Sequence, residues 1–188
     1  MIAQPPPTRR AVWHPAAMLR AALASLAVAA VLATAPPVLA APVDVPATLG
    51  ATLARVDART PLAILLPDTL ELDFDGAVYA SGTGGRRAWS FALAGAPKCG
   101  GATACFLASF TARRGATPDY RRRIRLRGGI PGWYKPLTCG ASCSPPVLQY
   151  RRRGVLYEIS ANVPDRTNAA ARRRLVAAAN AALRVGPR

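Results

Sequence analysis

The chain has 188 residues, which is enough for one domain of ordinary size and too few for a second core of comparable extent. Its 25 basic and 9 acidic residues give a formal net charge of +16, which favours anionic partners. The only histidine is His14, so the rest of the chain has no imidazole for Ser-His-Asp catalysis, for Cys-His catalysis or for a zinc site.

Residues 1–40 have the pattern of an export signal. Three arginines supply their positive charge, with no acidic residue beside them: Arg9, Arg10 and Arg20. Residues 21–35 form an apolar stretch too short to span a bilayer, and small residues precede a cleavage site before Ala41. The arginine pair fits the twin-arginine route, and the general secretory route stays open. We therefore predict a periplasmic or extracellular protein whose single mature domain, residues 41–188, has no membrane span.

The predicted mature domain contains four cysteines. An even number of cysteines in an exported chain favours two disulfides, for which three pairings are possible. We favour the two short loops, Cys99 with Cys105 and Cys139 with Cys143, because glycines inside each loop permit tight closure. A four-cysteine zinc site is the alternative, and an oxidising compartment argues against it. We expect no bound metal and no cofactor.

The N-terminal part of this domain is predicted to contain one short helix. Leu49, Leu53 and Val56 share one helical face over residues 47–56, although a glycine interrupts the run. The apolar residues 62–66 lie between two prolines and predict a short buried strand or extended segment.

Residues 70–75 alternate between apolar and acidic side chains. The apolar set is Leu70, Leu72 and Phe74, and the acidic set is Glu71, Asp73 and Asp75. This period of two predicts a strand with one wet acidic face, followed by a hairpin turn at Asp75 and Gly76 and then a turn at residues 81–85. A calcium loop starting at Glu71 is disfavoured because its twelfth position is Gly82.

Apolar patterns predict four further strands and a helix, in addition to an arginine-rich strand. Residues 89–93 and 106–110 alternate in the same way and are predicted to pair across the first cysteine loop. Residues 147–150 and 155–161 predict a hairpin. Asp165 or Thr167 is expected to cap a C-terminal helix that ends near Leu183 and buries the stripe formed by Leu175, Val176, Ala179 and Leu183.

An arginine-rich strand is predicted at residues 121–127. Ile124 and Leu126 are expected to face inward, and the outward set is Arg123, Arg125 and Arg127. These cations are suited to an anionic polymer. The structural alternative is a solvated strand face, balanced in part by the acidic strand.

Trp133 and Tyr134, next to Lys135, are the best candidates for a recognition surface. Flat rings beside a cation suit a sugar face, a peptide or an anionic glycan. The structural alternative is that one ring closes the end of the sheet.

The C-terminal half also carries a pattern found elsewhere. It consists of Gly129, Gly132, Trp133, Tyr134 and Pro136, the loop between Cys139 and Cys143, Leu148, Tyr150, Gly154, Tyr157 and Ile159, and a closing alanine-rich helix. This pattern resembles uncharacterised bacterial exported domains over residues 99–184. The resemblance implies the fold and export, and it implies no activity.

The expected fold is α+β, with an antiparallel sheet of about six strands packed against the C-terminal helix and the shorter N-terminal one. The expected role is non-enzymatic: a cationic binding module for an anionic envelope polymer or another envelope protein. Export argues against nucleic acid as the partner. The enzymatic alternative is a cell-wall glycan hydrolase, for which the candidate carboxylates are Glu71, Asp73, Asp75 and Glu158.

Overall fold

The computed structural model describes residues 41–99, 102–165 and 167–188. The predicted export signal lies outside the described residues. Neither helix in the described part of the chain is long and apolar enough to cross a membrane.

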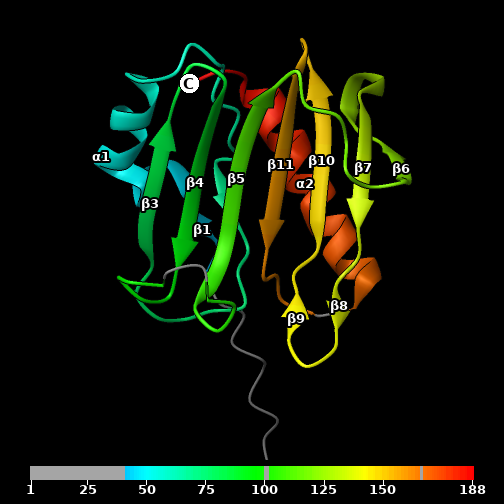
Figure 1. The fold of residues 1–188 in the computed structure, drawn as a ribbon. Helices are drawn as coiled ribbons and strands as arrows, with labels where there is room; N and C mark the ends of the chain where they lie inside the picture. Colours follow the sequence, from blue (N-terminus) through cyan, green and yellow to red (C-terminus); the bar gives the residue numbers. More distant parts are fainter. Residues whose placement is uncertain (1–40, 100–101, 166) are drawn as a thin grey trace, which may run out of the picture. The chain divides into compact units, whose positions relative to one another are not determined.

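A seven-stranded antiparallel sheet dominates the described fold (Figure 1). Its strands are β3 (Tyr79–Gly84), β4 (Ala88–Ala94), β5 (Phe106–Arg114), β6 (Arg122–Arg125), β7 (Pro131–Lys135), β10 (Val147–Arg152) and β11 (Val155–Ala161). They lie in the order β3-β4-β5-β11-β10-β7-β6. Two small sheets pair β1 (Val43–Asp44) with β2 (Thr69–Leu70), and β8 (Thr138–Cys139) with β9 (Cys143–Ser144). The predicted α+β class is confirmed, with seven strands in the main sheet.

Two helices pack on one face of this sheet (Figure 1). The first, α1 (Val45–Asp57), begins after Asp44, whose carboxylate accepts a hydrogen bond from the backbone N–H of Ala47 at 2.9 Å. It contacts β3, and it is interrupted at Gly50, where φ is +44°. The helix predicted at residues 47–56 is therefore confirmed, and the glycine that weakened the pattern marks its kink.

The second helix, α2 (Asn168–Val185), contacts β10 and β11. Of the two caps considered, Thr167 is the one used: its hydroxyl oxygen accepts from the backbone N–H of Ala170 at 3.3 Å. The helix ends at Gly186, where φ is +84°. Small side chains let this helix approach the sheet closely, and Ala171, Ala179 and Ala182 are each at most 1 % exposed.

The face of the sheet under the helices holds the core. One row of this face runs through Phe91, Phe110, Ile159, Leu148 and Tyr134, which are partners in register across five adjacent strands. Each of these side chains is at most 1 % exposed. Burying one such side chain contributes about 1.5–3 kcal/mol, so this row anchors the strand order.

The turn predicted at residues 81–85 is wrong, because residues 81–84 form most of β3. Glycines belong in this strand because α1 lies directly on it. A Cβ atom on Gly84 would stand 2.6 Å from the carbonyl oxygen of Val56, and one on Gly82 would stand 3.0 Å from Thr52. The glycines therefore serve close helix-on-strand packing rather than a reversal of the chain.

The hairpin predicted around Asp75 and Gly76 is also wrong. The expected burial is present, since Leu70 and Leu72 are buried and Glu71 is exposed. However, β2 ends at Leu70 and pairs with β1, and residues 71–78 form no strand. Alternating burial requires only one covered side, so it does not distinguish a paired strand from an extended segment.

The two expected disulfides are present. Cys99 is bonded to Cys105 and Cys139 to Cys143, with Cα–Cα distances of 5.7 and 4.0 Å. All four cysteines are thereby used, which removes the zinc alternative. Among the described residues, no group of three or more His, Cys, Asp or Glu side chains is placed to bind a metal ion.

Candidate functional site

The face of the main sheet opposite the helices, here called the open face, carries a row of polar side chains. Strand register places seven residues side by side, one from each strand: Thr83, Ser90, Thr111, Glu158, Gln149, Trp133 and Arg123. Each lies one position away from a residue that faces the helices, so all seven point to the open face. Along this face the row therefore runs from hydroxyl groups through a carboxylate and an amide to an indole and a guanidinium.

A shallow hollow of about 490 Å³ occupies part of this face. Its polar lining consists of Thr83, Ser90, Thr111, Arg113, Asp119, Tyr120 and Glu158. Asp119 and Tyr120 come from the segment between β5 and β6, which crosses in front of β10 (Figure 1). The side chain of Arg151 in β10 holds this segment by donating to the backbone carbonyl of Ala116.

Gln149 lies under this crossing segment and is 0 % exposed. Its side-chain nitrogen donates to Asp119 at 2.7 Å and to Glu158 at 2.6 Å, while its carbonyl oxygen accepts from the backbone N–H of Asp119 at 2.8 Å. A single buried amide thus bridges two carboxylates. Arg113 donates to the same Asp119 oxygen as Gln149, at 2.8 Å.

These contacts set the ionisation of the site. The hydrogen bond from Gln149, followed by that from Arg113, lowers the pKa of Asp119 below its ordinary value of 3.8. Burial, together with the charges of Glu158 and Asp119, raises the pKa of Tyr120. The hollow is therefore lined by an ionised Asp119 beside a neutral phenol near neutral pH.

Asp119 predicts a specific acid dependence of stability. A pKa that is lower in the folded than in the unfolded protein stabilises the fold above the unfolded value and ceases to do so as the pH falls through the folded value. We expect Asp119→Asn to lose less stability than the wild type between roughly pH 4 and pH 2. The difference should stay under about 1 kcal/mol because the Asp119 side chain is 51 % exposed. Urea denaturation across this pH range measures it.

Thr111, which lines the same hollow, provides the control for this measurement because Thr111→Val removes no carboxyl group. Thr111→Val should keep the acid dependence of the wild type. Equal losses of stability in Asp119→Asn and the wild type would contradict the assigned role of Asp119.

The structure separates the candidate recognition residues into two groups. Trp133, Arg123 and Arg125 lie on the open face together with Lys135, whose ammonium donates to the hydroxyl of Ser144. Tyr134 points the other way: it is 1 % exposed, and its hydroxyl donates to the carbonyl of Asn168 at 3.2 Å. Tyr134 thus belongs to the core, which is the structural alternative considered for one of the two rings.

Arg127 lies apart from the other arginines of its segment. It belongs to a short 3-10 turn, Arg127–Gly129, after β6, and its backbone N–H donates to the side chain of Asn180 in α2 at 2.8 Å. Of the three arginines that were predicted to point outward from this strand, only two therefore belong to the sheet, Arg123 and Arg125. Arg122 faces the helices instead, with its guanidinium carbon 5.8 Å from the centre of the Tyr134 ring.

The four carboxylates of the hydrolase hypothesis lie in different surroundings. Glu71 pairs with Arg174 of α2, and Asp75 is exposed. Asp73 and Glu158 line two different cavities. The carboxylate that does lie beside Glu158 is Asp119, for which the sequence offered no motif.

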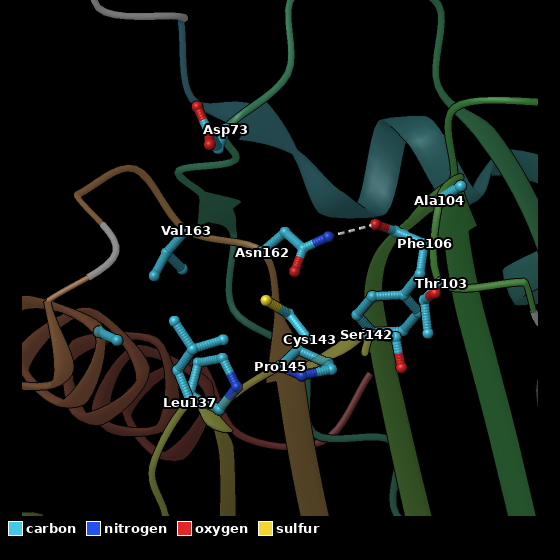
Figure 2. Close-up of a pocket in the computed structure, with 12 residues that line it drawn as sticks. Asp73, Thr103, Ala104, Phe106, Leu137, Ser142, Cys143, Pro145, Asn162 and Val163 are labelled. Atoms are coloured by element: carbon cyan, nitrogen blue, oxygen red, sulfur yellow. Dashed lines mark hydrogen bonds between the residues drawn. The ribbon is translucent and has the colours of Figure 1, made fainter. Parts of the chain in front are cut away.

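A second cavity, of about 340 Å³, opens where the two disulfide loops meet the end of the sheet (Figure 2). Cys143 and Thr103 bring the two loops to its wall, and Phe106 provides an aromatic surface. Figure 2 shows the amide of Asn162 beside it, donating to the carbonyl of Phe106 at 2.6 Å. The backbone carbonyl oxygen of Asn162 accepts a hydrogen bond from the backbone N–H of Asp73 at 3.0 Å, which fixes Asp73 at the rim.

Sequence reasoning missed Asp119, Gln149, Thr111 and Ser90 as site residues. One usable signal was present: Ser90 lies between Trp89 and Phe91, so its outward position followed from alternation. Alternation does not reveal which residues of different strands become neighbours.

Comparison of the chain with protein-family models, curated proteins and solved structures gives no match. The resemblance to exported bacterial domains thus stays a prediction. The function has to be inferred from the chemistry of the site.

Proposed function

We propose that this chain is an exported, non-enzymatic binding module that holds an anionic glycan of the cell envelope on its open face. The observation that carries the proposal is the polar row that ends in Trp133 and Arg123. Hydroxyl and carboxylate groups in the hollow match the donors and acceptors of a sugar. The half-buried Trp133 provides a flat apolar surface for a sugar face.

Charge at the β6 edge supports an anionic ligand. Arg123 and Arg125 are exposed, and neither has an ion pair with another residue in the part of the chain that the structure describes. Lys135 adds a third positive charge on the same face. Guanidinium groups bind carboxylate and phosphate groups in a bidentate manner, so this edge suits the charged substituents of a polymer.

The ionisation of the hollow favours binding over hydrolysis. A glycosidase requires one carboxylic acid whose pKa is raised so that it can donate a proton. The hydrogen bonds to Asp119 act in the opposite direction and lower its pKa. Gln149 also occupies the position between Asp119 and Glu158 in which a glycosidic oxygen or a water would react.

The proposal is tested by titrating the purified, oxidised protein with polygalacturonate, using dextran as the uncharged control. At about 0.15 M salt, Trp133→Ala and the double variant Arg123→Gln/Arg125→Gln should each bind about tenfold more weakly than the wild type. Trp133→Phe should retain most of the affinity because it keeps a ring.

The matched control removes two exposed arginines of α2, Arg173→Gln/Arg184→Gln, with the same change in net charge. This variant should lose less than about twofold in affinity. Equal losses in the two double variants would mean that attraction to bulk charge accounts for the binding, and the proposal would be wrong.

A further inference from the structure

A third cavity, of about 170 Å³, lies near the end of the sheet at which β10 turns into β11 (Figure 1). Arg152, Val155 and Tyr157 border it from the helix-covered side of the sheet, and Ala63 borders it from the extended segment 61–67. This volume is several times what one water molecule requires, so a small polyatomic ligand fits. The cavity is separate from the open face.

Three arginines are among the residues that line this cavity: Arg114, Arg152 and Arg153. No acidic side chain is among its lining residues, and none of the three arginines forms an ion pair within the described part of the chain. Like charges around one small space repel each other unless a counter-anion lies between them. The charge of the lining therefore indicates an anion.

Two buried donors have no hydrogen-bond partner among the described residues: Nη1 of Arg152, which borders the cavity, and the hydroxyl of Tyr150, which is not among its lining residues. The Tyr150 ring stacks on Tyr157, with ring centroids 5.3 Å apart, and the hydroxyl of Tyr157 is satisfied by the carbonyl of Ala63 at 3.1 Å. A buried donor without an acceptor is costly, so an acceptor is expected next to Arg152.

We propose that this cavity binds a small tetrahedral oxyanion, either free phosphate or sulfate or the same group on a larger ligand, with Arg152 as its central ligand. Arg114 and Arg153 complete the charge around it. A fork of N–H donors matches the oxygens of such a group better than it matches chloride. This site does not depend on glycan binding by the open face.

Calorimetric titration of the purified, oxidised protein with inorganic phosphate tests the site, with sodium chloride added to hold the ionic strength constant. Phosphate should bind with one-site stoichiometry and raise the melting temperature in a concentration-dependent way. Arg152→Gln should weaken phosphate binding by about tenfold or more, and Arg114→Gln, which changes an exposed residue, should weaken it as well. Arg173→Gln, which changes an exposed arginine of α2 that lines neither this cavity nor the hollow of the open face, is the control and should bind phosphate like the wild type.

Two results would overturn the proposal. One is a rise in melting temperature that chloride reproduces at equal ionic strength. This result would show that phosphate stabilises the protein only through ionic strength and does not bind in the cavity. The other is an equal loss of phosphate affinity in Arg173→Gln and Arg114→Gln. A parallel titration with glycerol phosphate distinguishes the sources: tighter binding than that of phosphate assigns the site to the terminal group of a larger ligand, and equal or weaker binding assigns it to the free anion.

Discussion

Replacing Gln149 by leucine is expected to lower the free energy of unfolding by about 2–4 kcal/mol at neutral pH. The wild-type amide satisfies both Asp119 and Glu158 from a position that is 0 % exposed. Leucine has a similar size but no donor, so two neighbouring carboxylates would lose their common partner. The backbone N–H of Asp119 would also lose its acceptor. Urea denaturation followed by circular dichroism measures the change.

The pH dependence separates this explanation from a packing defect. The deficit of Gln149→Leu should shrink as the pH falls below about 4, because the stability that Asp119 gains from the hydrogen bond of Gln149 is lost as its carboxyl group protonates. Thr111→Val, a change of similar shape in the same row, should cost less than about 0.5 kcal/mol. A deficit that stays constant with pH would show that Gln149 acts only by filling space.

Substituting Gly84 by alanine should destabilise the protein by about 1–3 kcal/mol. The added Cβ atom would stand 2.6 Å from the backbone carbonyl oxygen of Val56, and a backbone atom cannot move aside as the end of a side chain can. Helix α1 would have to shift away from β3, and part of its buried contact would be lost. Thermal or chemical denaturation measures the loss.

The neighbouring glycine supplies the control. A Cβ atom on Gly85 would lie 3.5 Å from the carbonyl oxygen of Ala88, which is an ordinary contact. Gly85→Ala should therefore be neutral or stabilise by up to about 1 kcal/mol, because alanine restricts the unfolded chain. A similar loss in both variants would contradict close packing of α1 on Gly84.

Much of the fold followed from local pattern. The alternation in residues 89–93, 106–110 and 155–161 predicted β4, β5 and β11, and the stripe in the last helix predicted its buried side. The pairing of Cys99 with Cys105 and of Cys139 with Cys143 followed from short spacing and from glycines within each loop. These features depend on residues close together in the chain, so the sequence contains the information directly.

The errors share one physical cause. Glycines at residues 81–85 have the composition of a turn, but Gly84 is required by a helix that lies elsewhere in the sequence. Alternation at residues 70–75 predicted the correct burial. However, β2 pairs with β1, and residues 71–78 form no strand. In both cases a distant segment decides what a local pattern means.

The amino-acid sequence by itself determined the basic charge, the absence of histidine after His14, the strand faces and the disulfide loops. Only the tertiary structure decided that Tyr134 is buried while Trp133 is presented on the open face, and that Asp119 reaches Glu158 through Gln149. The reason is that a period of two assigns side chains to a face, whereas the neighbours on that face depend on the register of seven strands. That register is fixed by core contacts such as Phe91 with Phe110 and Leu148 with Tyr134, which no single segment contains.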